Sequence, residues 1–186
     1  MATSPVEICN SALARLGSDR ITSLEDDTAR ARVLNEQYDN VRKSLLRAHP
    51  WGFAKKRLEL AALADAPLFG WDYYYQLPSD CLRVLGIDDD QVEWEKEGRY
   101  IGTDASTLQI LYIRDVTDTT LFDPHFEEAL AAALAYNISY AIHQSLPLKQ
   151  EIGKEADRLL ATARSFDAQE SALQTVQSGT FRDVRF

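Results

Sequence analysis

Cysteine is scarce in this chain of 186 residues, which holds only Cys9 and Cys81. Two thiols are too few for the disulfide framework of small secreted domains, so the sequence indicates a protein of a reducing compartment. No apolar run of about 18 residues occurs, so no membrane-spanning helix is predicted. The opening residues MATSPVEICN also lack the charged-then-apolar layout of a secretory signal, which argues against export by that route.

The short motifs of common enzymes are missing as well. The chain has no G-x-G-x-x-G, Walker lysine loop, G-x-S-x-G elbow or H-E-x-x-H. Its three histidines, His49, His125 and His143, have no second ligand at helical spacing, which argues against a zinc site. We therefore expect no catalytic residue, no cofactor and no metal ion. The alternative left open is an enzyme of unrecognised type that uses Cys81 or the acidic run 88–93.

Basic residues are outnumbered, with 20 Lys and Arg against 29 Asp and Glu and a formal net charge of −9. This balance argues against a protein that grips nucleic acid by neutralising its phosphates. The excess is uneven, because residues 67–120 hold four basic and eleven acidic groups. The middle third therefore carries most of the negative charge.

The periodicity predicts an α+β fold, mainly α, in which a helical bundle contains an inserted small antiparallel β region. We predict that residues 1–173 form a single domain and that residues 174–186 form a C-terminal extended arm. The predicted helices cover about 4–16, 28–48, 124–145 and 147–173, and the β region covers about 73–116.

Capping signals and apolar stripes support these helices. Ser4-Pro5-Val6-Glu7 has the pattern of a capping box, and Asp123-Pro124 marks a second start in the same way. The last helix is long for a domain of this mass, so we expect it either to project or to pack against a neighbour. The stripes of the second and third helices are Leu34, Tyr38, Val41, Leu45 and Ala48, and Phe126, Leu130, Leu134, Ile138 and Ala141.

The β region is predicted from β-branched and aromatic runs between turn residues, and it is either a small sheet or an extended hairpin. We expect its turns at Asp88-Asp89-Asp90 and Lys96-Glu97-Gly98. Residues 53–64, which precede it, are predicted as a short helix or an irregular extension. The expected strands are Tyr73–Leu77, Leu82–Ile87, Gln91–Glu95, Arg99–Gly102 and Thr107–Val116.

Two charged runs have competing interpretations. Asp88, Asp89, Asp90 and Glu93 are either a hard-cation site or a solvated turn, and the run lacks the glycine and spacing of a calcium loop. A basic run extends from the end of the second helix into the residues after it, and it is a solvated helix end, a nucleic-acid patch or a surface that meets the acidic region of another copy. The last interpretation makes both runs inter-subunit candidates. The basic run consists of Arg42, Lys43, Arg47, Lys55, Lys56 and Arg57.

The C-terminal residues 174–186 show no helical stripe. They form either a disordered tail or an arm that orders on a partner. In the second case Phe181, Val184 and Phe186 are apolar anchors, and Arg182 and Arg185 are polar clamps.

Four separated blocks of the chain resemble the tail tubular protein A family, the head-to-tail adaptors of short-tailed bacteriophages. The blocks are short, cover nearly the whole chain in the expected order, and contain no catalytic signature. The first block is Ile8–Gly17 with Ile21–Asp26, the third is Tyr75–Arg83, and the fourth is Phe122–Phe126. The second block consists of Val41-Arg42, Leu45-Leu46-Arg47, His49-Pro50-Trp51, Phe53-Ala54 and Arg57.

The resemblance implies a non-enzymatic virion protein that assembles as a dodecameric ring at the head-tail junction. Such a ring binds the portal protein and a tail nozzle of the tail tubular protein B kind, with tail fibres nearby, and continues the DNA channel without binding DNA specifically. The C-terminal segment of these adaptors reaches onto the portal, which would make Phe181, Arg182, Val184, Arg185 and Phe186 portal contacts. The protein would reside in the host cytoplasm before assembly. A non-viral oligomeric scaffold is the other alternative.

Overall fold

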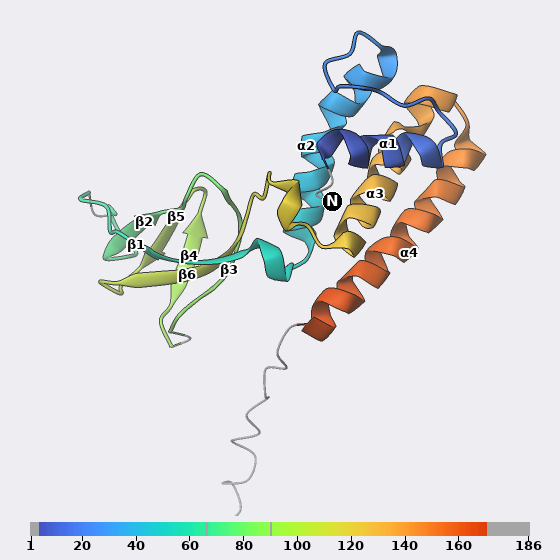
Figure 1. The fold of residues 1–186 in the computed structure, drawn as a ribbon. Helices are drawn as coiled ribbons and strands as arrows, with labels where there is room; N and C mark the ends of the chain where they lie inside the picture. The colour runs from blue at the N-terminus through green and yellow to red at the C-terminus, as the bar shows by residue number, and fades with distance from the viewer. Residues whose placement is uncertain (1–3, 66, 90, 171–186) are drawn as a thin grey trace, which may run out of the picture.

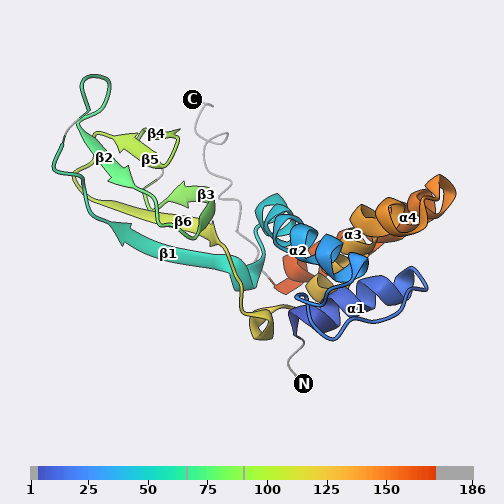
Figure 2. The ribbon, with the colours of Figure 1, turned by 90° about the horizontal axis from the view of Figure 1, so that it is seen from above.

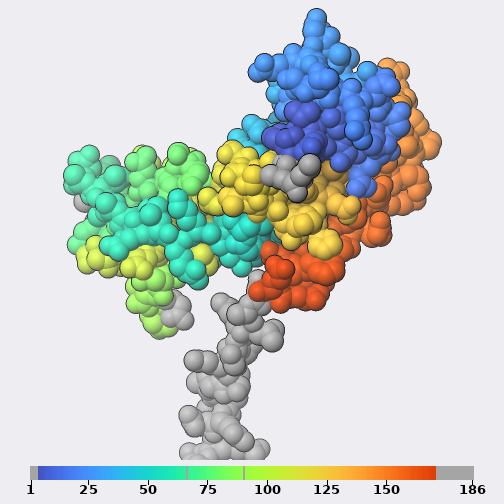
Figure 3. Space-filling model, viewed as in Figure 1, coloured from blue at the N-terminus to red at the C-terminus, as the bar shows by residue number. Residues whose placement is uncertain are grey.

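The computed structural model describes residues 4–65, 67–89 and 91–170. In these residues the chain forms a helical body and a β lobe that projects from one side of it (Figures 1 and 3). The predicted α+β, mainly α fold is confirmed. The helical body consists of α1 (Pro5–Arg15), α2 (Ala29–Ala48), α3 (Pro124–His143) and α4 (Leu146–Glu170).

The helices begin where the capping signals predict. The Ser4 side chain accepts a hydrogen bond from the Glu7 amide while the Glu7 carboxylate accepts from the Ser4 amide, so the capping box is complete. Asp123 caps α3, and Pro124 occupies its first turn, where a missing N–H costs nothing. Local sequence therefore defines these starts independently of the tertiary fold.

The apolar stripes of α2 and α3 are buried as predicted, except at their last members. Ala48 and Ala141 are exposed, and each lies in the last turn of its helix. The stripe therefore ends before the helix does, and both alanines were wrongly assigned to it. The confirmed members are Leu34, Tyr38, Val41 and Leu45 on α2, and Phe126, Leu130, Leu134 and Ile138 on α3.

Helix α4 runs along the outside of the helical body next to α3 (Figures 1 and 2). Its 25 residues span about 37 Å at about 1.5 Å per residue. Ile152 and Ala163 are its buried residues, and Glu155 forms an ion pair with Arg15 of α1. The long helix thus packs on its own chain and leaves most of its length exposed.

The β lobe consists of two three-stranded antiparallel sheets, with strand orders β1-β6-β3 and β2-β5-β4. It therefore exceeds the predicted hairpin or single sheet, and it begins at residue 55 rather than at residue 73. The strands are β1 (Lys55–Leu60), β2 (Tyr73–Gln76), β3 (Cys81–Ile87), β4 (Trp94–Glu97), β5 (Tyr100–Thr103) and β6 (Leu108–Arg114).

Residues 53–64 were predicted as a short helix or an irregular extension, and both alternatives are wrong. The chain forms a short 3₁₀ turn, Gly52–Ala54, and then β1, which pairs with β6. Leu58 and Leu60 alternate with charged residues, which is the two-residue period of a strand, although lysine, glutamate and leucine favour a helix in isolation. Pairing with a distant strand overrides that local preference.

The turn after β4 is shifted from its predicted place. The sequence predicted a turn at Lys96-Glu97-Gly98, but Lys96 and Glu97 belong to β4, and Glu97 pairs with Tyr100. Gly98 has a φ of 60°, and this positive value centres the two-residue turn on Gly98 and Arg99. The glycine, not the charged residues before it, sets the register.

The sheet β1-β6-β3 takes part in two hydrophobic clusters. Ile110 and Tyr112 of β6 pack in the cluster inside the β lobe, whereas Ile113 packs in the cluster of the helical body. Register shifts in β3 at 81–83 and 84–86 also allow Leu82 and Leu85 to face the helices. One sheet therefore holds the two parts of the molecule together.

Candidate interaction surfaces

A buried arginine, Arg42, links the helical body to Asp115 and Val116, which follow the last strand of the β lobe. We call this contact region the joint. Arg42 of α2 is 1% exposed, and its guanidinium donates hydrogen bonds to Asp115, Asp39 and the Val116 carbonyl oxygen. Burial alone would lower the pKa of Arg42, but the two carboxylates outweigh that effect and raise it. Arg42 was predicted as an inter-subunit contact. This prediction is wrong, because the side chain is buried and its hydrogen bonds are made within the same chain.

Three more of the predicted inter-subunit bases have partners within the chain, close to the same joint. Lys43 lies 3.7 Å from Asp115, and Lys56 lies 3.7 Å from Asp80. Arg47 donates to the Leu82 carbonyl oxygen at the start of β3. These exposed side chains connect α2 and β1 to the start of β3 and to the segment after β6, so each has a role within the chain.

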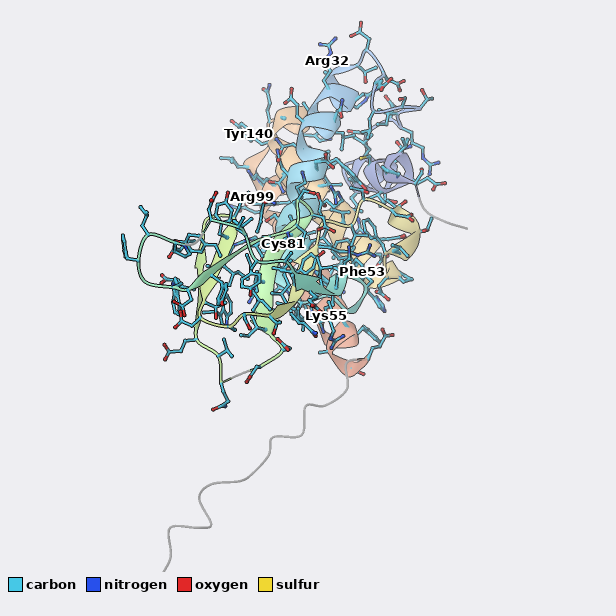
Figure 4. The ribbon with its side chains drawn as sticks, turned by 90° about the vertical axis from the view of Figure 1, so that its left-hand side faces the viewer. Arg32, Phe53, Lys55, Cys81, Arg99 and Tyr140 are labelled. Carbon is cyan, nitrogen blue, oxygen red and sulfur yellow. The ribbon has the colours of Figure 1, made fainter. Side chains whose placement is uncertain are left out.

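Lys55 and Arg57 complete the basic run and lie on β1, an edge strand of its sheet. Lys55 lies beside Phe53, where β1 leaves the helical body (Figure 4). Arg57 is exposed. Charged side chains on an edge strand hinder unwanted pairing with another strand, which accounts for both residues without a partner protein.

An aromatic cluster fills the same joint and contains residues from two of the four adaptor-like blocks. Phe126 makes edge-to-face contacts with Trp51, Phe53 and Phe122 at centroid distances of 5.0, 5.0 and 4.9 Å. The Trp51 indole is 1% exposed and donates a hydrogen bond to the Leu45 carbonyl oxygen. These residues pack the joint, and Phe53 and Phe122 also line a surface pocket beside it.

The other two blocks also have structural roles. Asn10 of the first block exchanges hydrogen bonds of 3.0 and 2.9 Å with the backbone of Ile21, which fastens the loop after α1. In the third block Asp80 accepts from the Tyr112 hydroxyl, and its carbonyl oxygen accepts from the Asp115 amide. The adaptor-like residues thus form a framework that ends at the joint.

The last turn of α4 is fastened next to this framework. Asp167 lies 2.9 Å from His49 Nε2 and accepts a 2.7 Å hydrogen bond from the Gly52 amide. His125 stacks on Phe166 at 4.1 Å. These contacts fix where α4 ends. The portal-contact candidates Phe181, Arg182, Val184, Arg185 and Phe186 lie outside the described residues, as does Leu173 at the end of the predicted helix.

The acidic candidates lie at the turn after β3. Asp88 pairs through its backbone and carboxylate with Gln109, and Asp89 accepts from the Gln91 amide, as in a solvated turn. Glu93 is exposed, and Asp90 lies outside the described residues. Within residues 4–65, 67–89 and 91–170, no group of three or more His, Cys, Asp or Glu is placed to hold a metal ion.

A second acidic surface lies on the outer side of the sheet β2-β5-β4. Glu95 and Glu97 of β4 are exposed there, and Tyr74 donates a 2.6 Å hydrogen bond to Glu97. That bond raises the pKa of Tyr74. Tyr100 stacks on Tyr74 at 6.0 Å. We call these four residues the acidic face.

The two cysteines have the properties of structural thiols. Burial raises the pKa of Cys9 to about 12. Burial and the neighbouring Asp80 raise the pKa of Cys81, which lies at the start of β3 (Figure 4). A raised pKa lowers the thiolate fraction at neutral pH, whereas a nucleophilic cysteine needs a lowered one. The environment of Cys81 therefore does not favour the enzymatic alternative.

The loop between β1 and β2 exposes large apolar side chains at the far end of the β lobe (Figure 1). Leu68 is 99% exposed and Phe69 is 87% exposed. The base of the loop is fixed, because the Leu63 amide donates to the Tyr74 carbonyl oxygen and Ala62 bridges to Tyr75. We call Leu68 and Phe69 the loop tip.

A groove of about 540 Å³ runs between α3 and α4. Tyr136 and Leu146 line it and are 39% and 62% exposed, and Lys149 Nζ lies 5.0 Å from the Tyr136 ring centroid. Gly153 allows the Tyr136 ring to approach α4, because a Cβ there would lie 3.1 Å from it. We call this feature the α3–α4 groove.

Sequence reasoning missed both apolar surfaces. Leu68-Phe69-Gly70 follows a proline and lies between two strands, a position where bulky apolar side chains are unusual. That signal was available in the sequence. The groove had no comparable signal, because its shape depends on how α3 and α4 pack against each other.

None of the helices in the described part of the chain is long and apolar enough to cross a membrane. The chain matches no protein-family model, and no curated protein matches it either.

Proposed function

We propose that this chain is a subunit of a head-to-tail adaptor ring of a short-tailed bacteriophage. The ring joins the portal to the tail nozzle and continues the DNA channel. The observation that carries the proposal is the position of the four adaptor-like blocks. Their side chains fasten the loop after α1, form the aromatic cluster and supply Arg42 and Asp80 to the contacts between the helical body and the β lobe. A connector requires rigid lobes that present separate surfaces, and a residue pattern devoted to a joint suits that role better than catalysis.

The charge distribution supports passage of DNA without binding. Glu95 and Glu97 lie exposed on the acidic face, and the whole chain carries −9. Repeated around a ring, such a face repels phosphates, so that a duplex slides without adhering. The proposal requires this face to line the channel. A lumen lined by Lys55 and Arg57 would contradict it.

Assembly on a portal tests the proposal. The full chain would be mixed with the portal ring encoded by the same genome, and the mixture would be examined by sedimentation and by negative-stain imaging. We expect a second ring stacked on the portal. A chain that neither forms rings nor binds the portal would refute the proposal, and rings without affinity for the portal would favour a non-viral scaffold.

Removal of residues 174–186 tests the arm. The described cores lie upstream of this segment, so we expect an unchanged melting temperature and weaker binding to the portal. Replacing Arg182 and Arg185 by Gln is the milder variant, and replacing the exposed Arg32 by Gln is its control. Equal portal binding by the truncated and full chains would rule out the arm as a portal contact.

A further inference from the structure

The loop tip and the α3–α4 groove lie at opposite ends of the molecule. Figures 1 and 2 show the loop between β1 and β2 at the outer end of the β lobe, whereas α3 and α4 form the other side of the helical body. Tyr140, which is 50% exposed, lies on α3 of the helical body (Figure 4). The two surfaces therefore cannot meet within one chain.

We propose that the loop tip of one copy docks in the α3–α4 groove of the next copy. This inference rests on the proposed function, because it specifies the contact by which neighbours in the ring associate. Two different surfaces of one chain that fit each other make a heterologous contact, which repeats from copy to copy and closes into a ring when the rotation allows it.

The loop tip has the properties of an anchor. Leu68 and Phe69 are almost fully exposed, yet the loop is held at both sides of its base. On the β2 side, the Trp71 indole lies over Gly102, and the Asp72 amide donates a 3.0 Å hydrogen bond to Asp104. A held base lowers the entropy lost when the tip is bound. Apolar anchors of this kind supply much of the free energy of association at interfaces.

The groove has matching size and chemistry. Its volume of about 540 Å³ lies within the roughly 300–1,000 Å³ of pockets that hold drug-sized ligands, so it has room for bulky side chains. Tyr136, Leu146 and Leu160 supply apolar surface, with Ala133 and Ala156 between them. An apolar tip would displace water from this surface, which is the source of the attraction.

The charges beside the two surfaces are complementary. Asp65 and Asp72 flank the loop tip, and residues 61–72, which connect β1 to β2, include no Lys or Arg. Lys149 and Lys154 line the groove together with a single acid, Asp157, and Lys154 also pairs with Glu151. The acids beside the loop tip therefore attract the lysines of the groove in another copy, which favours this docking orientation. Acids beside the tip also disfavour an anionic lipid surface as the occupant.

The first experiment perturbs each surface in the full chain. The variants are Leu68→Ser with Phe69→Ser on the tip, and Leu146→Glu in the groove, where a new carboxylate would face the acids of the loop. Leu121→Glu is the matched control, because Leu121 is 43% exposed on a different surface. We expect both test variants to need about tenfold more protein for half-assembly, with unchanged melting temperatures, and the control to assemble as the wild type does.

The second experiment identifies the contact directly. A photo-reactive benzophenone side chain replaces Phe69, and the crosslinked peptides are mapped by mass spectrometry. We expect links from position 69 to residues 133–160 of another copy. Links only to other segments, to the portal, or to added phosphatidylcholine vesicles would overturn the inference.

The outcomes separate this inference from the proposed function. Rings that form equally well from the tip variant, the groove variant and the wild type would overturn the docking contact and leave the adaptor function standing. A wild-type chain that forms no ring with or without the portal would overturn both. Loss of assembly in the Leu121→Glu control alone would also overturn the docking contact, since it would place the interface elsewhere.

Discussion

Replacing Asp115 by Asn should destabilise the chain by about 3 kcal/mol, because it removes the main anion beside a buried guanidinium. Breaking a buried ion pair by removing one partner costs about 3–5 kcal/mol. The lower end applies here, since the Asp115 side chain is 19% exposed and Asp39 remains as a second carboxylate for Arg42. The Arg42 side chain itself is 2% exposed, so water cannot replace the lost anion.

The reciprocal variant, Arg42→Met, should lower the free energy of unfolding by less than the roughly 3–5 kcal/mol expected for a broken buried ion pair. Asp115 would keep Lys43 at 3.7 Å and would keep its contact with water. The Val116 carbonyl oxygen would lose its donor, and an unsatisfied buried group costs about 1–3 kcal/mol. Because the two side chains interact directly, the double variant should cost less than the two single costs combined, by about 0.5–3 kcal/mol.

Urea unfolding followed by circular dichroism measures these free energies. The control is Asp27→Asn, which removes one partner of the exposed Arg32–Asp27 pair, whose side chains are 65% and 93% exposed. We expect the control to change the free energy of unfolding by less than about 0.5 kcal/mol. If Asp115→Asn were equally silent, or if the costs of Arg42→Met and Asp115→Asn were additive, the joint would not depend on this pair.

Three further outcomes are expected. Replacing Leu34, which is fully buried on α2, by Ala should lower the free energy of unfolding by about 2–5 kcal/mol in the same assay, and a loss below about 0.5 kcal/mol would contradict the burial. Gly102→Ala would place a Cβ 2.3 Å from the Trp71 ring, so it should cost about 1–3 kcal/mol and change tryptophan fluorescence, whereas Gly86→Ala meets no atom within 4 Å and should be nearly silent. Backbone hydrogen bonds from the preceding turn lower the pKa of Asp26 below 3.8, so its stabilising contribution is complete at neutral pH and is lost as the pH falls through the folded-state pKa. An NMR titration midpoint at or above 3.8 would contradict this.

The helical body was largely predictable from the sequence, because its signals are local. A capping box at Ser4, a cap and proline at 123–124, and stripes such as Leu34 to Leu45 depend on neighbours a few residues away. The first half of the β lobe was not predictable in this way. Strand β1 uses helix-favouring residues and is held by β6, about fifty positions further along the chain.

The candidate surfaces also divide into features that local sequence predicts and features that depend on distant segments. Charge runs were visible in the sequence, but the guanidinium of Arg42 turned inward, and no local pattern marks which base of a run will be buried. The partner, Asp115, lies 73 positions away and belongs to a segment read as the end of a strand. Interactions that depend on two distant segments meeting in space are invisible to periodicity.

Strand β6 has a consequence for how the molecule folds and unfolds. Tyr112 is embedded in one hydrophobic cluster, and the next residue, Ile113, is embedded in the other. Unfolding of either cluster would therefore remove packing from β6. As a result, neither the helical body nor the β lobe can unfold alone without a large cost in free energy. The chain should melt in a single cooperative transition, and the amide protons of β6 should be among the slowest to exchange with solvent.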